Sequence, residues 1–312
     1  MDGRRVPALR IGWIGVGKMG NPIVRALLDA GLTVTLLEPR LENRASAVAA
    51  GGRVAHSVAD LVAGSEMVFT TLNDDDALHR LMFGDESLAT HLAPGQVFVD
   101  MSTISPRLSE DIAAVLANRG VPYLRAPISG STATAGARSL TVIASGPEDA
   151  WRPAEPVLSV VASKTLWIGS GEEARYAKLA VNVLLGSTAA LLREALAVGR
   201  AGGLGSDVLM DVLCESVVGS PLLHYKRDAL AARDFEPAFS VAQMIKDLEL
   251  IGEVADHSGQ RLDLVQEVRR RFEQARRAGF ADQDYFVVVR DTLGDDQAGA
   301  SGAGARMRST SS

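Results

Sequence analysis

The sequence predicts an α/β Rossmann domain, with a doubly wound and mainly parallel sheet, followed by an all-α domain that a long interdomain helix joins to it. Three observations support this fold class. Apolar segments typical of buried strands alternate with helical patterns in the first half of the chain. A glycine-rich turn, Gly15-Val16-Gly17-Lys18-Met19-Gly20, follows the first of these strands. After residue 171 the strand patterns stop, and a long proline-free segment rich in alanine, leucine and valine begins.

The elements of the first half follow one another as strand and helix. Helical patterns lie at 19–30, 42–50, 75–82 and 106–119, and the last of these starts at Ser105-Pro106, a typical helix start. This alternation is typical of parallel strands connected by helices. The candidate strands are 11–15, 33–38, 67–71, 97–100, 122–125, 140–144 and 165–168.

The second half is predicted to be all-helical. Its first helix, 172–201, is apolar nearly all round, so we expect it to be buried on most sides. We therefore assign the Rossmann domain to 1–170 and the helical domain to 171–294, and we expect the Gly-, Ala- and Ser-rich tail 295–312 to be disordered. Further helices are expected at 207–216, 221–231, 240–258, 262–278 and 283–293.

Composition and charge narrow the class of protein. A chain of 312 residues exceeds one ordinary domain, and 47% apolar with 22% charged residues is normal for a soluble enzyme. A net charge of -6 argues against nucleic acid or an anionic membrane as the main partner. Cys214 has no second cysteine to pair with and is expected to be a small buried residue. The N-terminus lacks the apolar core of a signal peptide, and the charge-free run 179–192 is shorter than the roughly 20 residues of a membrane span, so we expect a cytoplasmic protein.

The glycine-rich turn has the spacing that a dinucleotide requires. Gly15 allows the tight turn, Gly17 lets the backbone approach a pyrophosphate, and Gly20 lets helix and strand pack closely. The N-terminus of the following helix offers free N–H groups to the phosphates. Glu38, which closes the second strand, could accept hydrogen bonds from the adenosine ribose and so favours NAD, whereas Arg40 could bind a 2′-phosphate and leaves NADP open.

Lys178 interrupts the apolar face of the long helix, and Asn182 lies one turn later on the same face. Burial would lower the pKa of this amine toward the working range of an acid–base catalyst. A lysine whose ammonium group reaches water is the equally consistent alternative. Ser129-Gly130-Ser131 follows a strand and could bind a carboxylate through N–H and hydroxyl groups, or be a plain serine-rich turn.

The remaining charged groups have simpler interpretations. Taken alone, Lys246-Asp247 is interpreted as a solvated charge pair within a helix. The run Asp74-Asp75-Asp76 is interpreted as the acidic start of a helix rather than a metal site. The five histidines have no metal-binding spacing, so no metal is expected.

Together these motifs resemble the 3-hydroxyisobutyrate dehydrogenase, or β-hydroxyacid dehydrogenase, family over about residues 9 to 294. The signatures occur in order: the glycine turn, the segment 100–106, Ala126-Pro127-Ile128-Ser129-Gly130, and the pair Lys178 and Asn182 followed by Lys246-Asp247. The resemblance implies hydride transfer between NAD or NADP and a small β-hydroxy acid or semialdehyde, with Lys178 as the catalytic acid–base. It also implies an oligomer, a homodimer or homotetramer formed through the helical domain.

The resemblance implies two groups of binding residues. The substrate carboxylate would be bound by Ser129, Gly130, Ser131, Asn182 and Lys246. The cofactor would be bound by the glycine turn and by Glu38, Arg40, Leu72, Asn73, Ala77, Thr103 and Lys246.

The chain departs from the family pattern at Asn73, Arg125, Ser131 and Val181, which leaves the substrate open among small 3-hydroxy acids and semialdehydes. Two alternatives differ in class. An imine reductase shares this architecture but usually lacks the lysine and the Pro-x-Ser-Gly turn. A non-catalytic dinucleotide-sensing protein would be expected to have lost the lysine.

Overall fold

The computed structural model describes residues 9–294, which form two compact units. Within that range the first unit contains residues up to 184 together with 245–265, and the second contains 185–244 and residues from 266 onward. The units therefore divide the chain inside the long helix, whereas the domain boundary at 170/171 stays a prediction. The tail 295–312, expected to be disordered, lies outside the described residues.

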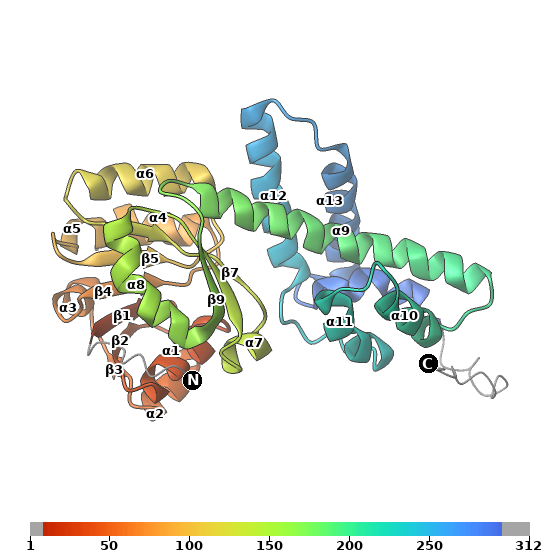
Figure 1. Ribbon diagram of the computed structural model, residues 1–312, viewed down its shortest axis with the longest axis horizontal. Coiled ribbons are helices and arrows are strands. Elements are labelled where there is room, and N and C mark those ends of the chain that lie inside the picture. The colour runs from red at the N-terminus through yellow and green to blue at the C-terminus, as the bar shows by residue number, and fades with distance from the viewer. Residues whose placement is uncertain (1–8, 295–312) are drawn as a thin grey trace, which may run out of the picture. The chain divides into compact units, whose positions relative to one another are not determined.

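A six-stranded parallel sheet forms the centre of the first unit, as the sequence predicts (Figure 1). Its order is β3-β2-β1-β4-β5-β6, so the winding reverses between β1 and β4. In sheets of this kind, ligands bind outside the carboxyl ends of the strands at such a reversal. The strands are β1 (Arg10–Ile14), β2 (Thr33–Leu37), β3 (Arg53–Val54), β4 (Met67–Thr70), β5 (Val97–Asp100) and β6 (Tyr123–Arg125).

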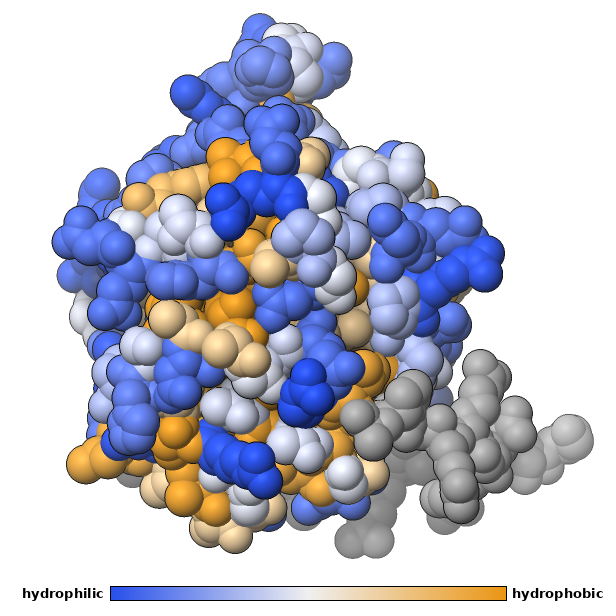
Figure 2. All heavy atoms as spheres, turned by 90° about the vertical axis from the view of Figure 1, so that its left-hand side faces the viewer, coloured by the Kyte–Doolittle hydropathy of each residue, from blue (hydrophilic) through white to orange (hydrophobic). Residues whose placement is uncertain are grey.

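Helices cover both faces of this sheet, which explains why its strands are apolar on both sides. One face packs against α1 (Gly20–Asp29), α2 (Leu41–Ala49) and α8 (Glu148–Val161) through a core that includes stacked Trp13 and Phe69. The other face packs against α3 (Val58–Ala63), α4 (Asp75–Phe83), α5 (Leu88–His91) and α6 (Pro106–Ala117). Figure 2 shows one face of this unit, on which hydrophilic side chains predominate with smaller hydrophobic areas between them.

A second, three-stranded sheet follows in the same unit. It contains β7 (Ile128–Ser129), β8 (Leu140–Ala144) and β9 (Ala162–Trp167) in that order, with α7 (Thr132–Gly136) between the first two. The strands predicted at 140–144 and 165–168 are therefore present, but they pair with each other and with an antiparallel β7 rather than extending the main sheet.

Two predicted helix starts have the capping that their sequences suggest. Ser105 Oγ accepts a hydrogen bond from the Leu108 N–H at 3.1 Å, and Pro106 occupies the first turn of α6. Asp74 Oδ1 accepts from the Ala77 N–H at 2.8 Å, so this acid caps α4. The first acid of the 74–76 run therefore has a structural role at a helix N-terminus.

The long helix α9 (Glu173–Ala201) begins in the first unit and ends in the second. Among the described helices, α9 alone is long and apolar enough to cross a membrane, judged by length and composition only. It carries Arg175, Lys178 and Asn182, which are all buried within the first unit. The expectation that this helix is buried on most sides is nevertheless wrong, because Leu184, Leu191 and Val198 are well exposed.

The second unit is helical. It contains the end of α9, the start of α12 (Val241–Ser258) and the C-terminal part of α13 (Asp263–Ala275), together with α10 (Ser206–Glu215) and α11 (Pro221–Ala231). The last segments are a kinked π-helical turn, Arg276–Phe280, and a 3-10 helix, Tyr285–Thr292. A buried ion pair between Lys226 and Asp284 (2.7 Å) joins α11 to the C-terminal segment. Cys214 is buried, as expected.

Candidate active site

The glycine turn between β1 and α1 requires glycine at two positions. Gly15 has φ +89°, and a Cβ at this residue would collide with the backbone oxygen of Thr71. A Cβ at Gly20 would collide with the backbone oxygen of Gly15. These contacts bring the start of α1 against the carboxyl ends of β1 and β4.

The same turn leaves room for a ligand backbone. A Cβ built on Gly17 meets no atom within 4 Å, so the space in front of this residue is open. The side chains behind the turn are bonded to one another, because Thr71 Oγ1 donates to the Gly15 oxygen and Trp13 Nε1 donates to Thr71 Oγ1 at 3.0 Å. A preformed turn at a helix N-terminus with open space at its middle glycine fits a pyrophosphate.

Glu38 lies at the end of β2 and is 7% exposed. Its carboxylate accepts hydrogen bonds from the N–H groups of Val16 and Arg40, both at 3.1 Å. The acid is therefore held beside the glycine turn, where the adenosine ribose of a dinucleotide would bind. Arg40, two residues after Glu38, and Lys18, in the glycine turn, are both exposed.

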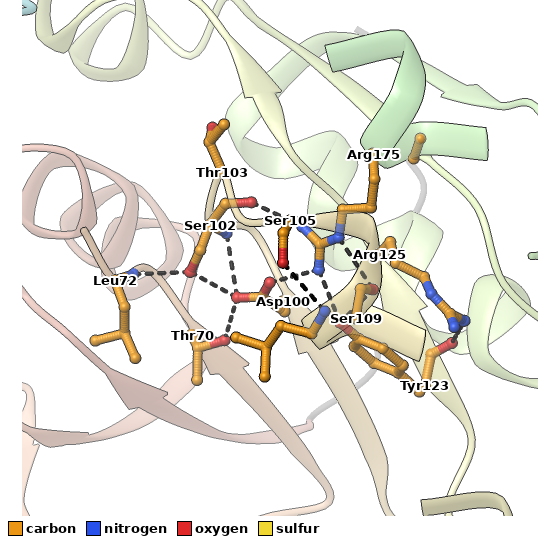
Figure 3. A network of polar contacts seen from close by, with 12 residues as sticks. Thr70, Leu72, Asp100, Ser102, Thr103, Ser105, Ser109, Tyr123, Arg125 and Arg175 are labelled. Carbon is orange, nitrogen blue, oxygen red and sulfur yellow. Dashed lines mark hydrogen bonds and ion pairs between the residues drawn. The ribbon is translucent and has the colours of Figure 1, made fainter. Parts of the chain in front are cut away.

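The carboxyl ends of β4 and β5 are joined by a buried polar network (Figure 3). Asp100 Oδ1 accepts hydrogen bonds from Thr70 Oγ1 and Ser102 Oγ, both at 2.6 Å. Ser102 Oγ in turn accepts from the Leu72 N–H at 2.9 Å. This network positions Leu72, one of the predicted cofactor residues. Of the other predicted cofactor residues, Asn73 is exposed and the Ala77 N–H is used by the cap of α4.

Lys178 is buried, with 9% of its surface exposed. Burial lowers its pKa below the usual range for lysine, the nearby Lys246 charge lowers it further, and the Asp247 carboxylate opposes both. The lysine side chain is therefore mostly withdrawn from water, whereas a solvated lysine would be well exposed.

Two charged residues of α12, Lys246 and Asp247, act on Lys178. Asn182 Nδ2 donates to Asp247 Oδ2 at 2.5 Å, and the Asn182 oxygen is buried without a hydrogen-bond partner among the described residues. Lys246 Nζ lies 2.7 Å from Asp247 Oδ1 and donates to the backbone oxygen of Thr103 at 2.6 Å. Asp247 is only 1% exposed, so the interpretation of this pair as a solvated charge pair is wrong. Tertiary contacts with α9 and the β5 strand end bury it.

The three residues of the serine turn, 129–131, have different local contacts. Gly130 has φ +147°, and a Cβ there would collide with Thr134 Oγ1. Ser131 caps α7, with its N–H donating to Thr134 Oγ1 at 2.6 Å and its hydroxyl accepting from the Thr134 N–H. Ser129 ends β7 and is half-buried.

Sequence reasoning did not identify Arg175 or the role of Arg125. Arg175 is 1% exposed and donates to Asp100 Oδ2 at 2.5 Å (Figure 3). Arg125 pairs with Glu172, directly before α9, and its guanidinium carbon lies 4.3 Å from the centre of the Tyr123 ring. The available signal was a charged residue inside an apolar helical pattern, and it was the same for Arg175 as for Lys178.

Comparisons with known proteins match both halves of the chain to known family models. Residues 10–169 match the model of the NAD-binding domain of 6-phosphogluconate dehydrogenase, and residues 170–291 match the NAD-binding domain of NADP-dependent 3-hydroxyisobutyrate dehydrogenase.

Curated relatives and a solved structure are similar over most of the chain. The chain is 30% identical to 2-(hydroxymethyl)glutarate dehydrogenase of Eubacterium barkeri, over 91% of this chain and 94% of that protein. It is 31% identical to the NAD-dependent L-serine dehydrogenase of Pseudomonas aeruginosa, over 89% of this chain and 96% of that protein. The solved structure of Mycobacterium tuberculosis 3-hydroxyisobutyrate dehydrogenase with L-serine has a TM-score of 0.82 at 28% identity, and the match covers 91% of this chain and 98% of that one. The chain belongs to the 3-hydroxyisobutyrate dehydrogenase family of NAD(P)-dependent β-hydroxyacid dehydrogenases.

Proposed function

We propose that this dehydrogenase acts on a small β-hydroxy acid or the corresponding semialdehyde, with Lys178 as the acid–base. The observation that carries the proposal is the burial of Lys178, whose pKa is lowered, beside Asp247 and Asn182. A lowered pKa brings the amine closer to the working range of a general acid–base.

The chemistry follows from the two protonation states of Lys178. In oxidation its neutral amine accepts the proton of the substrate hydroxyl while hydride leaves the same carbon. In reduction its ammonium group donates that proton to the developing alkoxide. A bound nicotinamide would accept or supply the hydride.

The substrate carboxylate is assigned to the serine turn and its neighbours. Ser129 and the Gly130 N–H are donors that the cap of α7 does not use. Ser131 donates its N–H within that cap, and its hydroxyl, which accepts there, still has a proton to donate. The unpartnered oxygen of Asn182 is an acceptor for a substrate hydroxyl. Lys246, held at Thr103, adds positive charge for the carboxylate.

We favour NAD over NADP as the coenzyme. The Glu38 carboxylate is held in place by two N–H groups, which suits ribose hydroxyls and repels a 2′-phosphate. Arg40 is exposed two residues later and is the group that NADP would use. The ratio of kcat/KM values for the two coenzymes tests this preference, and Glu38→Gln is expected to shift the ratio toward NADP. A wild-type enzyme that prefers NADP would contradict it.

Two other functions make different predictions. An imine reductase would reduce cyclic imines and ignore hydroxy acids, and the presence of Lys178 and Ser129 argues against it. A dinucleotide-sensing protein would bind coenzyme without turnover, and it would not need a buried lysine.

One assay separates these functions. The protein is mixed with NAD or NADP and a panel of 3-hydroxy acids, and the absorbance of the reduced nicotinamide is followed. We expect turnover with at least one acid. Tight coenzyme binding without turnover of any acid would favour the sensor, and turnover of imines alone would favour the imine reductase.

We further propose a cytoplasmic homo-oligomer. On α9, apolar side chains recur every seven residues and are well exposed: Leu184, Leu191 and Val198 are 69%, 53% and 75% exposed. This spacing places them along one side of the helix, as in a seam between helices. A second copy of the chain is the occupant we propose for this seam.

A further inference from the structure

Arg175 is a buried side chain of the strand-end network that donates four hydrogen bonds (Figure 3). Its guanidinium donates to Ser102 O at 2.7 Å and to Asp100 Oδ2 at 2.5 Å. The same group donates to Tyr123 Oη at 2.7 Å and to Ser109 Oγ at 3.2 Å. One side chain of α9 is therefore bonded to residues of β5, β6, α6 and the segment that follows β5.

Two buried contacts hold α9 on either side of Lys178. Arg175 lies three residues before the lysine and is bonded to the Ser102 oxygen. Asn182 lies four residues after it and donates to Asp247. Lys246 connects this contact to the strand ends, because it is paired with Asp247 and donates a hydrogen bond to the backbone oxygen of Thr103, the residue after Ser102. The turn that carries Lys178 thus has contacts at both ends with the segment 102–103, directly or through α12.

We infer that Arg175 is a positioning residue, which holds the Lys178-bearing turn of α9 at the strand ends where hydride and proton transfer take place. The inference rests on the proposed role of Lys178. It assigns a catalytic consequence to a side chain that does not itself reach the substrate.

The effect of Arg175 is geometric rather than electrostatic. Its charge is paired with Asp100, and the charged groups that act on Lys178 are Asp247 and Lys246 of α12. Four hydrogen bonds in different directions require the planar guanidinium fork, which a lysine at this position cannot reproduce. Small displacements of a catalytic group reduce its rate steeply. The four hydrogen bonds of Arg175 are to residues 100, 102, 109 and 123, not to the glycine turn.

The conservative variant Arg175→Lys keeps the positive charge and tests the geometry. We expect kcat to fall by about 10- to 100-fold, with the coenzyme Kd changed by no more than about twofold and one cooperative thermal transition retained. Looser packing would also admit water to Lys178 and reduce the effect of burial on its pKa. The pH at which oxidation becomes half-maximal should therefore move upward.

Two further variants provide controls. Arg200→Lys changes an exposed arginine of the same helix, whose hydrogen bond is to the Asp291 oxygen at 3.3 Å, and should leave kcat and its pH profile unchanged. Tyr123→Phe removes one acceptor of Arg175 while keeping the ring, so it should move both readouts in the same direction by less. It also serves if Arg175→Lys does not fold.

The outcomes separate this inference from the proposed function. An unchanged kcat and pH profile in folded Arg175→Lys, or in Tyr123→Phe if that is the variant that folds, would overturn the positioning role. A loss of kcat matched by a loss of coenzyme affinity would also overturn it. If the wild-type protein turns over no hydroxy acid, the proposed function fails instead. The pH dependence of Lys178 labelling by trinitrobenzenesulfonate, read by peptide mass, then still reports whether Arg175 controls the environment of the lysine.

Discussion

Replacing Lys178 with methionine should separate catalysis from stability. The lysine is 9% exposed, so a side chain of similar length and no charge can fill the same space. If Lys178 is the acid–base, its loss should reduce kcat by about 10²- to 10⁴-fold, equivalent to about 3–5 kcal/mol of transition-state stabilisation. Coenzyme affinity should be unchanged, because the glycine turn and Glu38 are intact.

The same variant should be at least as stable as the wild type. Burial lowers the pKa of Lys178 below its value in the unfolded chain, so the native state disfavours the ammonium form. This cost is fully present below the native pKa and disappears as the pH rises through the pKa of the unfolded chain. Methionine removes the cost at neutral pH, so the thermal midpoint should stay the same or rise.

The assay follows the absorbance of the reduced nicotinamide with saturating coenzyme and hydroxy acid, beside thermal unfolding. Lys164→Met, at an exposed position of β9, is the matched control and should alter neither quantity. Retention of more than about a tenth of wild-type kcat by Lys178→Met would refute the reasoning, since a general acid–base contributes more than this.

Other predictions concern pH, the glycine turn and the oligomer. Because the neutral amine of Lys178 is the base, kcat for oxidation should rise with pH through its lowered pKa and kcat for reduction should fall, as steady-state profiles in both directions would show. Gly15→Ala should lower the free energy of unfolding by about 1–3 kcal/mol because Gly15 has a positive φ, and denaturant unfolding measures this loss. A Cβ at Gly17 meets open space, so Gly17→Ala should keep the stability of the fold and lower the affinity for coenzyme, as calorimetry would show. Leu191→Glu on α9 should reduce the oligomer to smaller species in sedimentation, and an unchanged mass would contradict the proposed seam.

Some elements of the fold could not be predicted from the sequence. The helix α8 was not predicted, and it contains Pro153 and Pro156, which local propensity assigns to breaks rather than to helix interiors. Burial of its apolar face against the sheet overrides this preference. The separation of β8 and β9 from the main sheet was also missed, because strand patterns show which residues are extended and not which strands pair.

The sequence by itself determined the parallel sheet and the glycine turn, because both follow from short-range patterns: apolar periodicity and glycine spacing. A charge inside an apolar helix drew attention to Lys178, but the spacing left its role open, and the family resemblance favoured the acid–base. Only the tertiary structure decided that Asp247 is buried, that Ser131 is used as a helix cap, and that Arg175 is bonded to Asp100. The Arg175 contact joins residues 75 positions apart in the chain. Whether such a charge is solvated or paired depends on what folding brings beside it, and no local spacing contains that information.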